Sequence, residues 1–426
     1  MIPHFHILPM NVLKHKDMRN ESIDIAVIGG GAAGYFGAIN IAESNRTLKV
    51  VLFEGSHKPL AKVKVSGGGR CNVTHHLFEP AELVKRYPRG KKELRGPLTI
   101  FGPTETIAWF ADHGVQLKVE RDGRMFPTTD KSTTIIQCLT DAAQKGGVRL
   151  MLGTKVTVAK QVENGFQLTT NQDEILHCKK LLIATGSSRP GYALAQSFSH
   201  TIEKLVPSLF TFKIKDERLT DLPGVAFGDV GLTLMVEEKK FIASGPLLIT
   251  HWGLSGPGII RQSAWAAKAL YETNYQGTLK VNFLPRFTRE TLQTELIKIK
   301  ETRGKQKLMV SLFGEIPKRY WHRICELEGL SIDMQLATVT NKELNKIAVA
   351  LTEACFWVNG KGQFKEEFVT CGGVKLKEID FKTMESKIVP GLYFAGEVIN
   401  IDGITGGFNF QNAWTTSYLA AQHMAL

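Results

Sequence analysis

The sequence has few cysteines and lacks the long apolar runs that cross a membrane. Its 426 residues include six cysteines, and none of them forms a C-x-x-C pair or shows zinc-like spacing. No apolar stretch approaches the roughly 18 residues needed to span a bilayer. These absences argue against a disulfide framework, a metal site and a membrane partner, and they favour a cytoplasmic protein. The cysteines are Cys71, Cys138, Cys178, Cys325, Cys355 and Cys371.

The first 21 residues lack the order of a secretory signal. His4, His6 and Pro9 interrupt the apolar stretch, and the basic residues follow it rather than precede it. Met18 lies just before the first predicted strand. We therefore take residues 1–21 as an N-terminal extension and hypothesise that translation begins at Met18.

Acidic residues are fewer than basic ones, 41 against 53, which leaves a formal net charge of +12. Part of the excess lies in three runs, at 85–95, 298–307 and 317–323, and the first and third also contain aromatic residues. One interpretation is that these runs are solvated helix faces and loops. The other is that they share one face and contact the phosphate backbone of a nucleic acid. The sequence leaves both interpretations open.

A glycine-rich turn is the clearest motif. Residues 25–34 predict a short apolar strand, a turn and the start of a helix. Gly29, Gly31 and Gly34 occupy the glycine positions of G-x-G-x-x-G, which permit a tight turn, backbone approach to a pyrophosphate and close helix packing. Glu54 ends a second apolar strand 20 residues later, where an acid holds the ribose of an adenine dinucleotide. The motif predicts dinucleotide binding without distinguishing FAD from NAD.

The rest of the chain predicts an α/β protein whose nucleotide-binding domain is interrupted by an insertion. Helices are expected at 103–114 and 130–145, and apolar strands between 148 and 184. From about residue 191 the pattern changes to short strands broken by Gly and Pro, followed by helices rich in Lys and Glu. The expected parts are the first part of the nucleotide-binding domain at 22–190, an inserted substrate or partner domain at 191–347, and the second part at 348–426.

Later segments are typical of flavoproteins with two dinucleotide-binding folds. Residues 182–186 are an apolar strand ending in Ala-Thr-Gly, although a plain strand end explains that pattern equally well. Residues 388–397 form another apolar strand closing on an acid, and residues 406–412 open a final helix. A second G-x-G-x-x-G is lacking, because the glycines at 224–231 have the wrong spacing. We therefore expect no dedicated NAD(P)H domain.

Together with the segments at 66–72, 123–127, 250–257 and 383–387, these features resemble the YhiN/BaiN-like family of bacterial flavoproteins. The resemblance runs from about residue 22 to the C-terminus. It implies FAD as cofactor and a Rossmann-like, two-dinucleotide-binding flavoprotein fold with an inserted β-barrel plus helical domain. The loop at 187–193 is shorter than in the family, so we expect the entrance to the site to differ.

The resemblance also implies which residues contact FAD. They follow the cofactor from pyrophosphate and adenosine to the ribityl chain and flavin ring, where a helix N-terminus would stabilise the negative charge of the reduced ring. The pyrophosphate and adenosine contacts are Gly29, Gly31, Ala32, Ala33, Gly34, Glu54, Val156, Thr185 and Gly186. The contacts beside the pyrophosphate, ribityl chain and ring are Arg70, Cys71, Asn72, Gly396, Glu397, Gly407, Phe408 and Asn409.

Two residues are candidate proton donors. Cys71 follows Arg70 in the glycine-rich segment, and the alternative is that its thiol only packs beneath the cofactor. His251 lies in a loop interrupted by glycine, and the alternative is a hydrogen-bonded structural histidine. Trp252 and Phe408 are either stacking platforms for a ring substrate or core residues.

The resemblance implies an FAD-dependent oxidoreductase. The favoured substrate is a uridine of large-subunit ribosomal RNA, reduced to dihydrouridine by hydride from the flavin and a proton from Cys71 or His251. A transient NADH or NADPH is a possible electron donor. One alternative is a small-molecule flavoenzyme, either an aminoacetone-type amine oxidase or an enone reductase. Another is a non-catalytic FAD-binding factor in ribosome assembly. The sequence predicts no oligomeric state.

Overall fold

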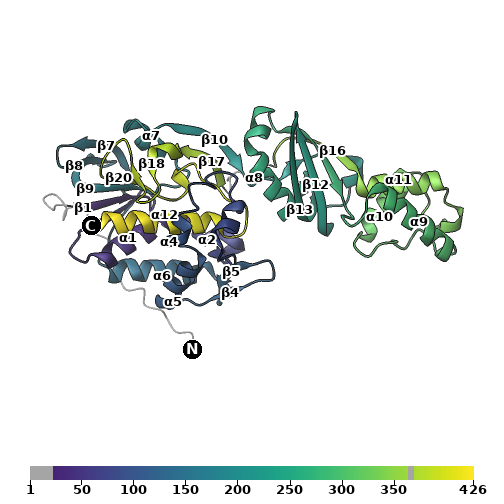
Figure 1. The fold of residues 1–426 in the computed structure, drawn as a ribbon, viewed down its shortest axis with the longest axis horizontal. Helices are drawn as coiled ribbons and strands as arrows, with labels where there is room; N and C mark the ends of the chain where they lie inside the picture. The colour runs from purple at the N-terminus through teal and green to yellow at the C-terminus, as the bar shows by residue number, and fades with distance from the viewer. Residues whose placement is uncertain (1–22, 363–368) are drawn as a thin grey trace. The chain divides into compact units, whose positions relative to one another are not determined.

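The computed structural model describes residues 23–362 and 369–426 (Figure 1). The chain forms two compact units: the first ends at Leu205 and resumes at Val369, and the second lies between these positions. Both borders come later than those expected at 191 and 348. The reason is that α7 (Arg189–Ser197) packs on a strand of the first unit, whereas β16 (Ala354–Asn359) pairs within the sheet of the second.

The first unit is built on a mostly parallel sheet. Its strands are β1 (Ile23–Ile28), β2 (Val50–Glu54), β6 (Arg149–Leu152), β7 (Val156–Val162), β8 (Gly165–Thr170), β9 (Ile175–Ile183), β18 (Ile379–Asp380), β19 (Glu385–Ser386) and β20 (Leu392–Phe394). The parallel order is β20-β9-β1-β2-β6, so strands from both ends of the chain lie next to one another. Antiparallel pairs add β8 and β7 beside β9, and β19 and β18 beside β20. Leu181, Leu182 and Ile183 are fully buried, as expected of a central strand covered on both faces.

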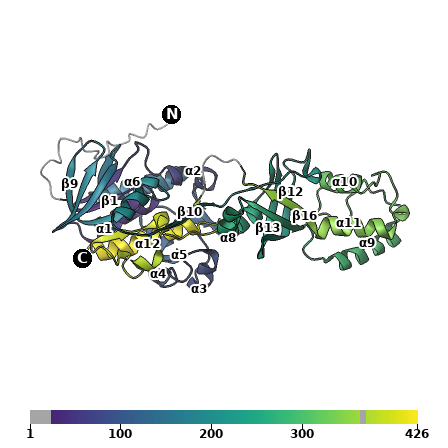
Figure 2. The ribbon, with the colours of Figure 1, turned by 90° about the horizontal axis from the view of Figure 1, so that it is seen from above.

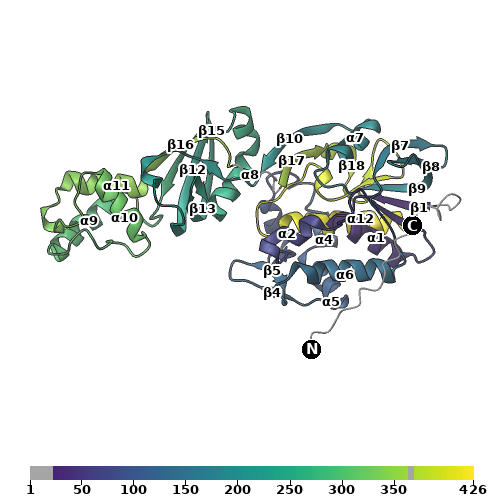
Figure 3. The same cartoon turned by 180° about the vertical axis from the view of Figure 1, so that it is seen from behind.

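The first unit also contains α-helices, some of which pack on this sheet. They are α1 (Ala32–Ser44), α2 (Ala61–Gly69), α3 (Pro80–Leu83), α4 (Pro97–Ile100), α5 (Pro103–Asp112), α6 (Ser132–Lys145), α7 and α12 (Phe408–Met424). The two expected helices at 103–114 and 130–145 are confirmed as α5 and α6. On α6, Ile135 and Leu139 lie one turn apart and are fully buried, which is the spacing of an amphipathic helix. Helices α1 and α12 lie side by side (Figures 1 and 3).

Two small sheets complete the first unit. One has the order β3-β5-β4, and the other pairs β10 with β17. Their bounds are β3 (Thr74–His75), β4 (Leu117–Val119), β5 (Arg124–Pro127), β10 (Ile202–Ser208) and β17 (Val369–Val374).

The second unit contains a six-stranded antiparallel sheet. Its strands are β11 (Phe212–Lys213), β12 (Ala226–Val236), β13 (Lys239–Thr250), β14 (Gly253–Ser255), β15 (Gln276–Asn282) and β16. The order is β11-β14-β13-β12-β15-β16. The two outer strands are also joined, because Lys213 N–H donates to Gly360 O at 2.8 Å and Gly362 N–H donates to Thr211 O at 2.8 Å. These bonds join the two edges of the sheet, and its closure into the expected barrel stays a prediction.

Four helices accompany this sheet: α8 (Pro257–Glu272), α9 (Arg289–Arg303), α10 (Lys318–Leu327) and α11 (Asn341–Thr352). Helix α11 begins with a capping box, in which Thr340 Oγ1 accepts the Glu343 N–H and the Glu343 carboxylate accepts the Thr340 N–H. Within this unit, α9, α10 and α11 gather beyond one end of the strands (Figure 2). The Lys- and Glu-rich segment expected to be helical is thus helical.

Candidate functional site

The glycine turn between β1 and α1 is shaped by two close backbone contacts. Gly29 has a φ of +113°, and a Cβ there would lie 2.5 Å from the Ala184 carbonyl oxygen. A Cβ on Gly34 would lie 1.8 Å from the Gly29 carbonyl oxygen. Both positions therefore require glycine, Gly29 for the turn and Gly34 for close packing of α1 on the turn.

The start of α1 opens into free space. Gly31 is the N-cap, and a Cβ there would meet no atom of the described residues within 4 Å. Because Gly31 has no side chain, no side chain caps the N–H groups of the first turn. A helix N-terminus with open N–H groups is suited to bind a phosphate.

Glu54 stands at the end of β2, beside this turn. Its Oε2 accepts the Gly30 N–H at 2.7 Å, and its Oε1 accepts the Ser56 N–H at 2.8 Å. Thr154 N–H donates to the Glu54 carbonyl oxygen at 3.0 Å, which brings the start of β7, with the buried Val156, to the same edge of the sheet. Glu54 and Val156 thus lie near one another, and their contact with adenosine stays a prediction.

The Ala-Thr-Gly turn after β9 completes this edge. The Thr185 hydroxyl oxygen is buried and finds no hydrogen-bond partner among the described residues. Gly186 has a φ of +59°, and its Cβ would lie 3.7 Å from Glu397 Oε2. The turn therefore lies between the glycine turn at Gly29 and the acid that follows β20.

Gly396 and Glu397 bring the C-terminal part of the chain to α1. A Cβ on Gly396 would lie 2.7 Å from the Ala33 Cβ. Glu397 Oε1 accepts the Thr370 N–H at 2.9 Å, and its Oε2 lies 2.7 Å from Lys62 Nζ. The structure thus brings together the expected residues of the two chain ends.

The glycine-rich segment at 66–72 ends α2 with a kink formed by glycines of positive φ. Arg70 then points to the β4–β5 hairpin. Its guanidinium lies 2.5 Å from Glu120, 3.5 Å from Asp130 and 4.0 Å above the Phe126 ring. The bond to Glu120 raises the pKa of Arg70. Because its charge is compensated by the hairpin, its expected pyrophosphate contact stays a prediction.

Cys71 and Asn72 have different surroundings. Cys71 is completely buried, and burial raises the pKa of its thiol to about 12. This environment favours the packing interpretation over a proton donor. The Asn72 amide, with its nitrogen toward the carbonyl oxygens of Thr74 and Met125, accepts the Gly407 N–H at 2.9 Å. Asn72 therefore holds the N-terminus of α12.

Phe408 and Asn409 form the first turn of α12. Phe408 is buried and stacks on the His75 ring at a centroid distance of 4.8 Å, so it belongs to the core rather than to an exposed platform. The Asn409 side chain accepts the Gly403 N–H at 2.8 Å and donates to the Gly403 carbonyl oxygen at 2.9 Å. These bonds close a compact loop before the helix.

His251 and Trp252 lie in the second unit, at the turn between β13 and β14. His251 is exposed, and Trp252 is 36% exposed. Trp252 Nε1–H donates to Thr211 Oγ1 at 3.0 Å. Cys71 and His251, the two expected proton donors, therefore belong to different units.

The aromatic residues of the basic runs are core residues. Tyr87, Tyr320 and Trp321 are fully buried. The Tyr87 hydroxyl donates to the Phe408 carbonyl oxygen at 2.7 Å, and Trp321 Nε1–H donates to the Leu308 carbonyl oxygen at 2.6 Å. These aromatic side chains are therefore not available to stack on a partner.

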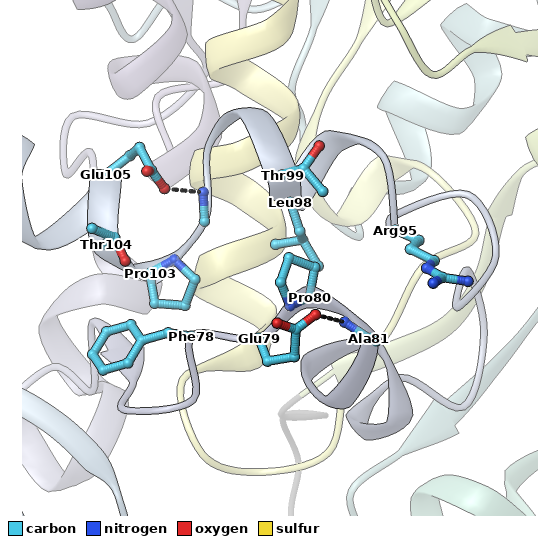
Figure 4. A pocket seen from close by; sticks show the side chains of 11 residues that line it. Phe78, Glu79, Pro80, Ala81, Arg95, Leu98, Thr99, Pro103, Thr104 and Glu105 are labelled. Carbon is cyan, nitrogen blue, oxygen red and sulfur yellow. Dashed lines mark hydrogen bonds between the residues drawn. The ribbon is translucent and has the colours of Figure 1, made fainter.

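A separate pocket of about 460 Å³ lies among α3, α4 and α5 of the first unit (Figure 4). It includes none of the residues expected to contact FAD. Its lining residues are Phe78, Glu79, Pro80, Ala81, Arg95, Leu98, Thr99, Gly102, Pro103, Thr104 and Glu105.

Sequence reasoning missed Lys62. Its Nζ donates to Ser187 Oγ at 2.9 Å and to Glu397 Oε2 at 2.7 Å, so it ties α2 to both later loops. No local pattern marks Lys62, because its carboxylate partner lies 335 residues away in the chain.

The residues at this edge fit an adenine dinucleotide. The open α1 N-terminus, the unpartnered Thr185 hydroxyl and the acid at Glu54 offer the donors and acceptors that phosphate and ribose groups require. In 23–362 and 369–426, no group of three or more His, Cys, Asp or Glu side chains could hold a metal ion. Among the same residues, no helix is long and apolar enough to cross a membrane.

Comparison with curated proteins finds relatives of full length. The chain is 31% identical over 415 residues to a ribosomal RNA dihydrouridine synthase of Escherichia coli, covering 95% of this chain and 98% of that protein. It is 30% identical to the protein of the same name from Haemophilus influenzae, covering 93% and 96%. It is 29% identical to a 3-dehydro-bile acid delta(4,6)-reductase of Clostridium scindens, covering 94% and 98%.

The fold also matches a solved structure. A 3-ketosteroid-delta4-(5alpha)-dehydrogenase from Rhodococcus jostii superposes with a TM-score of 0.51 at 12% identity, covering 97% of this chain and 98% of that one. The family model described as the HI0933-like protein Rossmann domain matches residues 23–423. The chain therefore belongs to the HI0933-like Rossmann family and is an FAD-dependent oxidoreductase.

Proposed function

We propose that this protein reduces a uridine of large-subunit ribosomal RNA to dihydrouridine. The observation that carries the proposal is the alignment, over nearly the whole chain, with two proteins named ribosomal RNA dihydrouridine synthase. The net charge of +12 and the exposed basic residues suit an RNA substrate. Such a substrate would also place the protein in the cytoplasm.

We propose that FAD lies along the edge where the two chain ends meet. The α1 N-terminus at Gly31 would hold the pyrophosphate, and Glu54 would hold the adenosine ribose. Glu397 would face the ribityl chain, and the N-terminus of α12 at Gly407 would face the flavin ring. Bound FAD supplies the hydride chemistry, and the chain supplies orientation and a proton.

Cys71 and His251 stay the two candidate proton donors. Burial and a pKa of about 12 keep Cys71 protonated at neutral pH but remove it from solvent, so it is the weaker candidate. His251 is exposed to solvent. Replacement of His251 by Gln tests its role, and loss of turnover with unchanged FAD content is the expected result.

NADH or NADPH is the proposed electron donor, bound transiently. The glycines at 224–231 fall in and just before the antiparallel strand β12 rather than in a strand–turn–helix unit. A nicotinamide would therefore have to reach the flavin without a Rossmann domain of its own. Stopped-flow bleaching of the flavin absorbance by either nucleotide measures this step.

The decisive experiment maps dihydrouridine in ribosomal RNA from cells with and without the gene. One uridine of the large-subunit RNA is expected to lose its modification on deletion and to regain it with the wild-type gene, but not with a variant that cannot hold FAD. An unchanged modification map after deletion would contradict the proposal.

The second candidate is a small-molecule reductase acting on an enone. It is favoured by the 29% identity to the bile acid reductase, which covers 94% of this chain. Reoxidation of the reduced flavin by a steroid-like enone, with no reoxidation by ribosomal RNA fragments, would select this candidate.

A further inference from the structure

The basic run at 85–95 presents its cations to solvent. We call these residues the basic strap. Arg86, Lys91, Lys92 and Arg95 are all exposed. The only acid within the strap, Glu93, is partly buried. Glu82 lies beside the strap, pairs with Lys85 and is attracted to the charges of Arg86 and Lys91. The exposed cations still outnumber the acids within 85–95, so the strap carries a net positive charge.

The other surface of the strap is fastened to the loop that precedes α12. The Tyr87 hydroxyl donates to the Phe408 carbonyl oxygen at 2.7 Å, and Ile404 N–H donates to the Arg86 carbonyl oxygen at 3.0 Å. A Cβ on Gly90 would lie 2.4 Å from Ile401 Cγ1, so the Gly90 backbone packs directly against the Ile401 side chain. These contacts fix the strap against the loop that precedes α12.

An ion pair locks this attachment. Arg89 forms a two-pronged pair with Asp402, whose carboxylate is fully buried, and the two residues also form a β-bridge. Charge-assisted bidentate bonds of this kind fix geometry strongly. Because Arg89 turns inward, it is not one of the cations available to a partner.

The strap also borders the pocket of Figure 4. Arg95 lines that pocket together with the half-exposed Phe78 and the hydroxyl-bearing Thr99 and Thr104. The carboxylates of Glu79 and Glu105 also line the pocket, and each accepts a backbone N–H, from Ala81 and Gly102. Arg95, the two hydroxyls and the exposed ring are the groups that suit a phosphate and the base attached to it. The pocket therefore extends the charged surface of the strap.

We propose that the outer surface of the basic strap binds the phosphate backbone of a single-stranded segment of the RNA substrate. This inference rests on the proposed function. It assigns to Arg86, Lys91, Lys92 and Arg95 the phosphate contacts beside the loop that leads into α12. RNA held there lies next to the residues proposed to face the flavin ring.

The test compares two variants that lose the same charge. The strap variant carries R86Q, K91Q, K92Q and R95Q. The control carries K131Q, K145Q, K160Q and K382Q, which are exposed lysines scattered over the same unit. Both are made as full-length protein loaded with FAD, and thermal melting and flavin absorbance check that each is folded and holds its cofactor.

Binding of a large-subunit RNA fragment is measured at several salt concentrations. Four lost phosphate contacts are expected to reduce the slope of log K against log[salt] by about 3, at roughly 0.7 per contact. The control is expected to keep the wild-type slope within about 1. In turnover, the strap variant is expected to raise KM for RNA at least tenfold with kcat nearly unchanged.

A strap variant whose slope equals that of the control would overturn the inference while leaving the proposed function intact. A wild-type protein that neither binds nor reduces RNA would overturn both. Strap-dependent binding to vesicles of phosphatidylserine and phosphatidylcholine, without strap-dependent RNA binding, would also overturn it.

Discussion

Arg89 and Asp402 lie 313 residues apart in the sequence and form a bidentate ion pair in which the aspartate is completely buried. The pair joins the strap at 85–95 to the loop before α12. Replacing Asp402 by Asn would leave the largely buried guanidinium without its counter-charge. We expect D402N to lower the free energy of unfolding by about 3 kcal/mol and to reduce the FAD content.

Urea unfolding monitored by circular dichroism measures this loss. The matched control is E82Q, which breaks the exposed pair between Glu82 and Lys85. Because exposed pairs contribute little, E82Q is expected to leave the free energy of unfolding nearly unchanged. Equal losses of unfolding free energy in D402N and E82Q would show that the buried pair stabilises the protein no more than the exposed pair does.

The two alanine substitutions at Gly34 and Gly31 are expected to act on different properties. A Cβ at Gly34 would collide with the Gly29 carbonyl oxygen, so G34A should destabilise the apoprotein by at least about 2 kcal/mol. A Cβ at Gly31 meets no atom of the described residues, so G31A should leave unfolding of the apoprotein nearly unchanged.

The methyl group added by G31A would, however, lie where the pyrophosphate is expected to approach the backbone. We expect G31A to weaken FAD binding at least about tenfold, measured by flavin fluorescence titration of the apoprotein. If G31A bound FAD as tightly as wild type, the α1 N-terminus would not be the pyrophosphate site.

Cys71 is expected to be dispensable for chemistry. Its thiol is fully buried, with a pKa of about 12, so C71A should cost about 1 kcal/mol of stability and keep turnover within about threefold of wild type. Loss of a true general acid typically costs 10²–10⁴ in rate. A drop of that size in C71A, with FAD content unchanged, would restore Cys71 as the proton donor.

His200 should make the stability of the first unit depend on pH. Its Nδ1 lies 3.1 Å from Glu378 Oε2 and its Nε2 lies 2.8 Å from Ser386 Oγ. Burial lowers the pKa of His200, although Glu378 partly opposes the shift. The unfolded chain therefore takes up a proton near pH 6.5 that the folded chain resists.

The stabilising contribution of neutral His200 is complete above about pH 6.5 and decreases as the pH falls below that value. Melting temperatures of wild type and H200Q, measured from pH 7.5 to 5.5, should therefore converge as the solution becomes more acidic. The control is H177Q, at an exposed position. A constant difference between wild type and H200Q would contradict the prediction.

Local patterns were sufficient to predict much of the first unit. The turn at Gly29 and the strand ending at Glu54 depend on residues within 30 positions of one another. Helix α6 depends on a 3.6-residue period, and β9 on a continuous apolar run. Each of these patterns arises from backbone sterics or from the burial of side chains close together in the chain. The element can therefore be predicted from the residue types alone.

The borders between the units were less predictable. Strand β16 belongs to the second unit because it pairs with β15, and a change of composition does not reveal which strand will pair with which. The meaning of the basic runs was also ambiguous. Tyr87 and Trp321 look like stacking partners beside arginine and lysine, yet packing buries both.

The sequence by itself determined the strand–turn–helix unit that is expected to bind an adenine dinucleotide, because glycine positions and apolar periodicity act over short distances. Only the tertiary structure decided that Cys71 is sealed in the core, that Lys62 meets Glu397, and that Arg89 meets Asp402. These relationships join residues hundreds of positions apart, and they exist only once the two chain ends have packed into one sheet.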